Sequence, residues 1–229
     1  MQQSDLLSMA IRLAFTILIA HCISSHDTHA ESFGDRQIAQ VLDDRPAMRD
    51  IVPTDHPIYR FASEKFSTGG LQNRRVHWDN TEPMYGAEHA CETLCVVRVA
   101  SDQGYTGRDK WAMLIFELFN LSHAGDVGKL RWKVVHGEID KDAFVHESLR
   151  LEIDAMRRTQ AFLTRYPIPG VAPTVYGFYY RFLATPFTID EYLGFLDRNQ
   201  RKLRYDPRVY NAKIYDSLRP SSTPVQNGG

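Results

Sequence analysis

The clearest apolar pattern lies in the middle of the chain. Residues 111–121 read W-A-M-L-I-F-E-L-F-N-L, so apolar side chains would occupy every face of a helix. A helix that is hydrophobic all round is buried in the core instead of lying on the surface. The pattern therefore predicts a central buried helix over residues 108–121.

A second pattern predicts a long helix with one apolar stripe. Asp140 is a suitable N-cap, and the helix is expected to run to about Tyr166. The P-I-P-G sequence that follows ends it, because proline cannot continue the hydrogen-bond ladder. The stripe consists of Val145, Leu149, Met156 and Leu163, with Ala155 and Thr159 beside it.

The remaining segments predict a mainly helical α+β protein. Residues 95–100 (C-V-V-R-V-A) are β-branched and apolar and form the best strand. Shorter helices are expected at residues 35–42, 57–66, 125–135, 188–203 and 207–218. Many helices with few strands indicate the α or α+β class, with a small sheet.

The first thirty residues have the three parts of a secretory signal. Arg12 precedes a short apolar run, L-A-F-T-I-L-I-A at residues 13–20, and small or polar residues follow as far as Ala30. The run is far shorter than the roughly 20 residues that span a bilayer. A buried N-terminal helix is the alternative.

This pattern predicts a signal peptide at residues 1–30, one domain at 31–218 and a disordered tail at 219–229. The tail is expected because its last ten residues, P-S-S-T-P-V-Q-N-G-G, lack apolar periodicity. The mature protein would be secreted or periplasmic, with no stable membrane span. A chain of 229 residues with 27 basic and 28 acidic side chains has no charge excess that would indicate a nucleic-acid partner.

Two carboxylates stand where apolar residues are expected. Glu117 lies within the central apolar helix, three residues before Asn120 and so on the same face. Glu152 lies on the stripe of the long helix. A buried carboxylate costs free energy unless it is paired, hydrogen-bonded or neutralised. Each carboxylate is either a structural contact or part of a functional site. For Glu152, the structural alternative is a position at the edge of the stripe with the side chain reaching outward.

These residues carry a resemblance to zinc peptidases. Residues 116–120, F-E-L-F-N, have the register of the H-E-x-x-H helix with Phe116 and Asn120 in place of the two histidines. Glu117 matches the general base, and Glu152 is the best match for the third ligand of the Glu-zincin branch. The stretch 111–162 is similar to uncharacterised bacterial proteins with an F-E-L-x-N helix, which implies zincin-like helices and a strand before the first of them.

The resemblance implies the fold more than the activity. Catalytic zinc needs about three protein ligands, and neither phenylalanine nor a neutral amide supplies a good one. We therefore expect a non-catalytic binding or structural protein, with no metal or cofactor and an unknown protein or peptide partner. Glu117, Asn120 and Glu152 would occupy the former catalytic site. Two alternatives stay open: a zinc-dependent hydrolase that uses Glu117, His123 and Glu152, and a plain helical interaction module.

Cys91 and Cys95 remain after removal of residues 1–30 and could form a disulfide in an oxidising compartment. Cysteines four apart lie too far from each other on one strand and are marginal on a helix. The bond would need a turn between them, with Cys95 opening a strand. The sequence leaves the pairing open.

Overall fold

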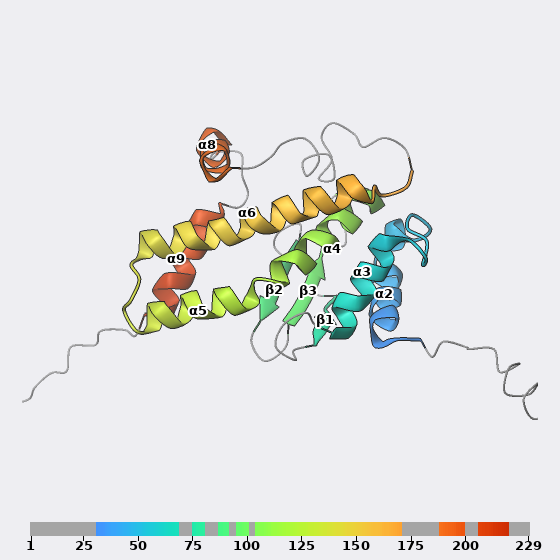
Figure 1. Cartoon of the computed structure of the whole chain (residues 1–229), viewed down its shortest axis with the longest axis horizontal. Coiled ribbons are helices and arrows are strands. Elements are labelled where there is room, and N and C mark those ends of the chain that lie inside the picture. Colours follow the sequence, from blue (N-terminus) through green and yellow to red (C-terminus); the bar gives the residue numbers. More distant parts are fainter. Residues whose placement is uncertain are drawn as a thin grey trace, which may run out of the picture. The chain divides into compact units, whose positions relative to one another are not determined.

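The computed structural model describes residues 31–68, 75–80, 87–91, 95–100, 104–170, 188–199 and 206–219 (Figure 1). The chain divides into two units, Met1–Ser32 and Phe33–Gly229, and every element named below belongs to the second. The expected signal peptide and residues 220–229 of the expected tail lie outside the described residues, as do the side chains of 87–91.

The described residues confirm a mainly helical α+β architecture. Its helices are α2 (Phe33–Asp44), the short 3-10 helix η1 (Pro46–Met48), α3 (Pro57–Thr68), α4 (Gly107–Leu121), α5 (Ala124–Val135), α6 (Lys141–Arg165), α8 (Ile189–Asn199) and α9 (Pro207–Leu218). Its strands are β1 (Val76–Trp78), β2 (Ala87–Cys91) and β3 (Cys95–Val99). They form one sheet in the order β1-β3-β2, in which β3 pairs parallel with β1 and antiparallel with β2.

The central helix is buried as the apolar pattern predicts. Thr106 and Asp109 form a capping box at the start of α4, which satisfies two free backbone N–H groups there. From Trp111 to Leu118 every residue is buried. The helix packs against β2, β3, α3 and η1 as well as α6, so it lies between the sheet and the long helix (Figure 1).

The long helix α6 connects three apolar clusters. Asp140 caps it by accepting a hydrogen bond from the backbone N–H of Ala143 at 2.8 Å, as predicted. Ala155 and Leu163 join the main core beside α4. Leu149 packs with α8, and Phe144 packs with α5 and α9. The predicted stripe is therefore divided between different neighbours instead of facing a single core.

The sheet contains more than the predicted strand. Strand β3 begins at Cys95, and β2 lies beside it as a hairpin arm that places Cys91 directly opposite Cys95 in the ladder. Cys95 is disulfide-bonded. The backbones of Cys91 and Cys95 thus face each other on two antiparallel strands, an arrangement that differs from both the single strand and the single helix considered above.

The segment 45–48 links three parts of the fold. The guanidinium of Arg45 is buried and donates from Nε and Nη2 to the carbonyl of Val99, at 3.1 and 3.0 Å. The indole N–H of Trp111 donates to the carbonyl of Met48 at 3.0 Å. At Gly107, one helical turn before Trp111, a Cβ atom would overlap the carbonyl of Ala47. Helix α4 thus packs directly on the backbone of this segment.

Candidate functional site

The structure places the buried Glu117 beside the partly buried Asn120. Glu117 is 3% exposed, and the Asn120 amide Nδ2 donates to its Oε2 at 3.4 Å. This is a long hydrogen bond between residues three apart on α4. Glu117 is therefore a buried carboxylate beside Asn120. Phe116, at the position of the first zinc ligand in the resembled motif, is buried with it.

Glu152 makes a contact with a different helix. Its side chain is half-buried, and its Oε1 accepts a hydrogen bond from the hydroxyl of Tyr192 at 3.2 Å. Tyr192 belongs to α8 and is itself buried in the cluster that includes Leu149 and Leu196. This bond gives Glu152 a structural role between α6 and α8.

His123 makes a third, separate arrangement. It lies between α4 and α5 and is buried, and its Nε2 is 3.0 Å from Asp154 Oδ2. Arg158 Nε approaches the same oxygen at 2.7 Å. The imidazole and carboxylate are close without hydrogen-bond alignment. Burial lowers the pKa of His123 below its usual value of 6.5, although Asp154 acts in the opposite direction.

These groups do not assemble into a metal centre. Asp154 and Glu152 are two residues apart on α6 and so project from different sides of the helix, one toward His123 and the other toward Tyr192. Among the described residues, no three His, Cys, Asp or Glu side chains are placed to hold one metal ion. The set Glu117, His123 and Glu152 is described in full, so this geometry gives no support to the alternative zinc site.

The environment of His123 predicts a loss of stability in mild acid. Because the pKa of His123 is lower in the folded state, the neutral imidazole makes its full contribution to the free energy of unfolding only above the unfolded-state pKa of 6.5. It is lost as the pH falls from there through the folded-state pKa. Urea unfolding should show that the free energy of unfolding falls more between pH 7 and pH 5 in the parent than in His123→Gln.

The matched control for this measurement is His146→Gln, because His146 is a half-exposed histidine of α6. The free energy of unfolding of His146→Gln should fall between pH 7 and pH 5 by as much as that of the parent. Asp126 faces His123 too, but its pKa is lowered by Lys129, so it titrates below this window. Equal losses in the parent and in His123→Gln would contradict this assignment.

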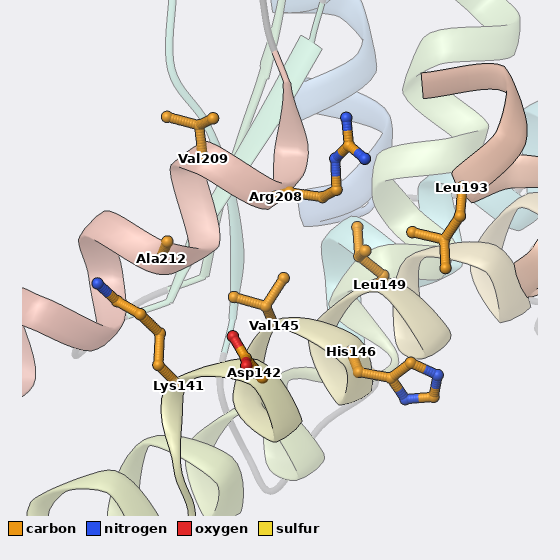
Figure 2. A pocket seen from close by; sticks show the side chains of 9 residues that line it. All are labelled: Lys141, Asp142, Val145, His146, Leu149, Leu193, Arg208, Val209 and Ala212. Atoms are coloured by element: carbon orange, nitrogen blue, oxygen red, sulfur yellow. The ribbon is translucent and has the colours of Figure 1, made fainter. Parts of the chain in front are cut away.

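A pocket of about 430 Å³ opens elsewhere, between α6, α8 and α9 (Figure 2). Its volume falls in the range of small-ligand sites, roughly 300–1,000 Å³. Most of its exposed lining is apolar. The lining residues are Lys141, Asp142, Val145, His146 and Leu149 of α6, Leu193 of α8, and Arg208, Val209 and Ala212 of α9. None of the predicted site residues belongs to it.

The two cations of the pocket already have carboxylate partners. Arg208 is held by Asp206 and Asp197, and these contacts raise the pKa of its guanidinium and lower that of Asp206. Lys141 reaches Asp216 across the α6–α9 contact at 2.7 Å. The pocket therefore offers an apolar surface with a largely neutralised rim, which favours an apolar group over a free anion.

Sequence reasoning missed the partners of His123 and Glu152, and the whole pocket. Both contacts join residues more than thirty positions apart, so no local spacing indicates them.

Comparison of the sequence with protein-family models, curated proteins and solved structures gives no significant match. The interpretation of the site therefore rests on its own geometry and on the resemblance of residues 116–120. Within the described residues, no helix has both the length and the apolar character needed to cross a membrane.

Proposed function

We propose that this protein is a non-catalytic binding protein with zincin-like helices and an eroded metal site, and that its partner is a protein or peptide. One observation carries this proposal. The three polar groups of the alternative zinc site, Glu117, His123 and Glu152, each contact a different partner. A hydrolytic site would need them to converge on one metal ion and one water molecule.

The position of Glu117 supports the zincin-like part of the proposal. Strand β3 precedes α4 and packs against it, which is the order of elements that the resemblance implies. Glu117 lies on this helix at the position of the general base, but its neighbour at the second ligand position is the amide of Asn120. A neutral amide makes a poor zinc ligand, so the pair fits a structural contact that replaced a metal site.

The pocket between α6, α8 and α9 is where we expect the partner to bind. Its lining is mostly apolar and includes Leu193 and Val209, and the charges of Arg208 and Lys141 are compensated. Such a site would recognise an apolar side chain by shape and by removal of water.

Export is part of the same proposal. The pattern of residues 1–30 supports a signal peptide, and the disulfide at Cys95 fits an oxidising compartment such as the periplasm or the cell exterior.

The isosteric change Glu117→Gln tests the absence of a metal role. Glutamine keeps the size of the side chain and can still accept a hydrogen bond from Asn120, while it removes a buried charge. We expect the free energy of unfolding at neutral pH to stay within about 1 kcal/mol of the parent, or to rise. Thermal unfolding should be insensitive to a chelator, and elemental analysis should find no stoichiometric metal in either protein.

Glu152→Gln tests the second carboxylate of the alternative zinc site, and its amide oxygen can still accept from Tyr192. It should behave like the parent in all three measurements. The opposite result has a clear signature. If chelation destabilises the parent by the same amount as Glu117→Gln, and one equivalent of metal disappears in the variant, the protein is a metalloprotein and the proposal fails.

A further inference from the structure

Helix α5 exposes an apolar ridge on the side that faces away from the core. Trp132 is 52% exposed and Val135 is 51% exposed, and the two lie three residues apart on one face. Gly128 is one turn before Trp132, and a Cβ atom there would meet nothing within 4 Å. The opposite face of α5 packs through Val134 against Phe144 and Tyr215. The ridge is therefore separate from the packing of the helix.

Helix α5 carries more basic than acidic side chains. Helix α5 carries Lys129, Arg131 and Lys133 against one acid, Asp126, a net charge of +2 in a chain of net charge −1. Asp126 pairs with Lys129 at 3.0 Å. Lys133 is exposed and makes no ion pair within the described part of the chain. A local positive charge beside exposed apolar groups matches a partner that is both anionic and apolar.

We propose that the outer face of α5 binds the surface of a membrane that contains anionic lipids. The indole of Trp132 and the side chain of Val135 enter the headgroup region, while the exposed Lys129 and Lys133 contact lipid phosphates. Tryptophan is well suited to this boundary because it has an apolar ring and a polar N–H. The helix lies on the surface and does not cross it, in agreement with its length of 12 residues.

The geometry favours lipid over nucleic acid. Binding of a single-stranded nucleic acid uses bases stacked on open aromatic faces. The imidazole of His136 is stacked on the Trp132 indole, with ring centroids 3.9 Å apart and an interplanar angle of 25°, so one face of the indole is covered. The His136 ring is held there by a contact of its Nδ1 with the Trp132 carbonyl at 2.8 Å. The Trp132 side chain is nevertheless 52% exposed and so can reach a headgroup layer.

The three tryptophans make a direct test possible in the full-length mature protein. Trp78 and Trp111 are buried, at 6% and 0% exposure, so a change in emission on binding reports Trp132. Vesicles of phosphatidylcholine with phosphatidylglycerol should shift the emission to the blue and co-sediment the protein. Brominated lipid should quench this emission, and raised salt should release the protein. Vesicles of phosphatidylcholine alone should neither shift the emission nor co-sediment the protein, and soluble glycerophosphate should leave the emission unchanged.

Two variants separate the apolar and electrostatic parts. In co-sedimentation, Trp132→Gln should weaken binding roughly tenfold, and Lys133→Gln about fivefold. The controls are Tyr210→Gln, at an exposed aromatic residue of α9, and Arg60→Gln, at an exposed cation of α3; both should bind as the parent does. Circular dichroism checks that each variant is folded.

Three results would overturn the proposal. The first is equal binding to neutral and anionic vesicles. The second is sedimentation with vesicles while the emission of Trp132 stays unchanged, which would place the contact elsewhere. The third is binding to a single-stranded oligonucleotide or to soluble glycerophosphate in preference to the vesicles. Each outcome is independent of the metal measurements on Glu117, so this inference and the proposed function can fail separately.

Discussion

Replacement of Gly107 by alanine is expected to destabilise the protein by about 3 kcal/mol or more. The added methyl group would overlap the carbonyl oxygen of Ala47 and the side chain of Ile51. Because one of these obstacles is backbone, side-chain rotation cannot relieve the clash, and α4 must move away from the segment 45–48. Thermal unfolding should show a midpoint lower by about 10 °C.

Gly128→Ala provides the matched control for this change. Gly128 lies within α5, and a Cβ atom there meets open space. Alanine is the better helix former by roughly 0.5–1 kcal/mol, so this variant should be slightly more stable than the parent. Equal effects at the two glycines would contradict the close approach of α4 to Ala47.

Replacement of Trp111 by alanine is expected to cost about 3–5 kcal/mol, a large part of the stability of a typical domain. Trp111 is fully buried, packs beside Tyr59 and donates its indole N–H to the carbonyl of Met48. The change removes a large apolar side chain and leaves a buried carbonyl without its donor. Chemical denaturation followed by far-ultraviolet circular dichroism measures the loss.

Trp111→Phe separates the two contributions. It keeps most of the apolar contact and removes only the N–H, so we expect a loss of about 1–3 kcal/mol, smaller than that of Trp111→Ala. A phenylalanine variant as stable as the parent would mean that the hydrogen bond to Met48 contributes little.

Much of the helical framework is readable from the sequence, because its signals are local. Asp140 caps α6 as its position predicts. Thr188, where the helix of residues 188–203 is expected to begin, exchanges hydrogen bonds with Glu191 at the start of α8. The all-round apolar character of residues 111–121 predicts the burial of α4. Each of these features depends on residues at most a few positions apart.

The missed features depend on distant partners. Strand β1 has three residues, which is too short for an alternating pattern, and β2 (A-E-H-A-C) contains residues with low strand propensity. Both strands are defined by pairing with β3. The same reasoning applies to the site: the Glu117–Asn120 contact joins residues three apart and is predictable, whereas the Glu152–Tyr192 contact joins two helices.

The packing of α4 on the segment 45–48 has a consequence for folding. The Trp111–Met48 and Arg45–Val99 hydrogen bonds join residues 63 and 54 positions apart, so long loops must close before they form. Such closure costs chain entropy before native contacts compensate for it, and it slows folding. Until these contacts form, the apolar side chains of residues 111–121 are exposed to solvent. This stretch is therefore where incompletely folded chains are most prone to associate with one another.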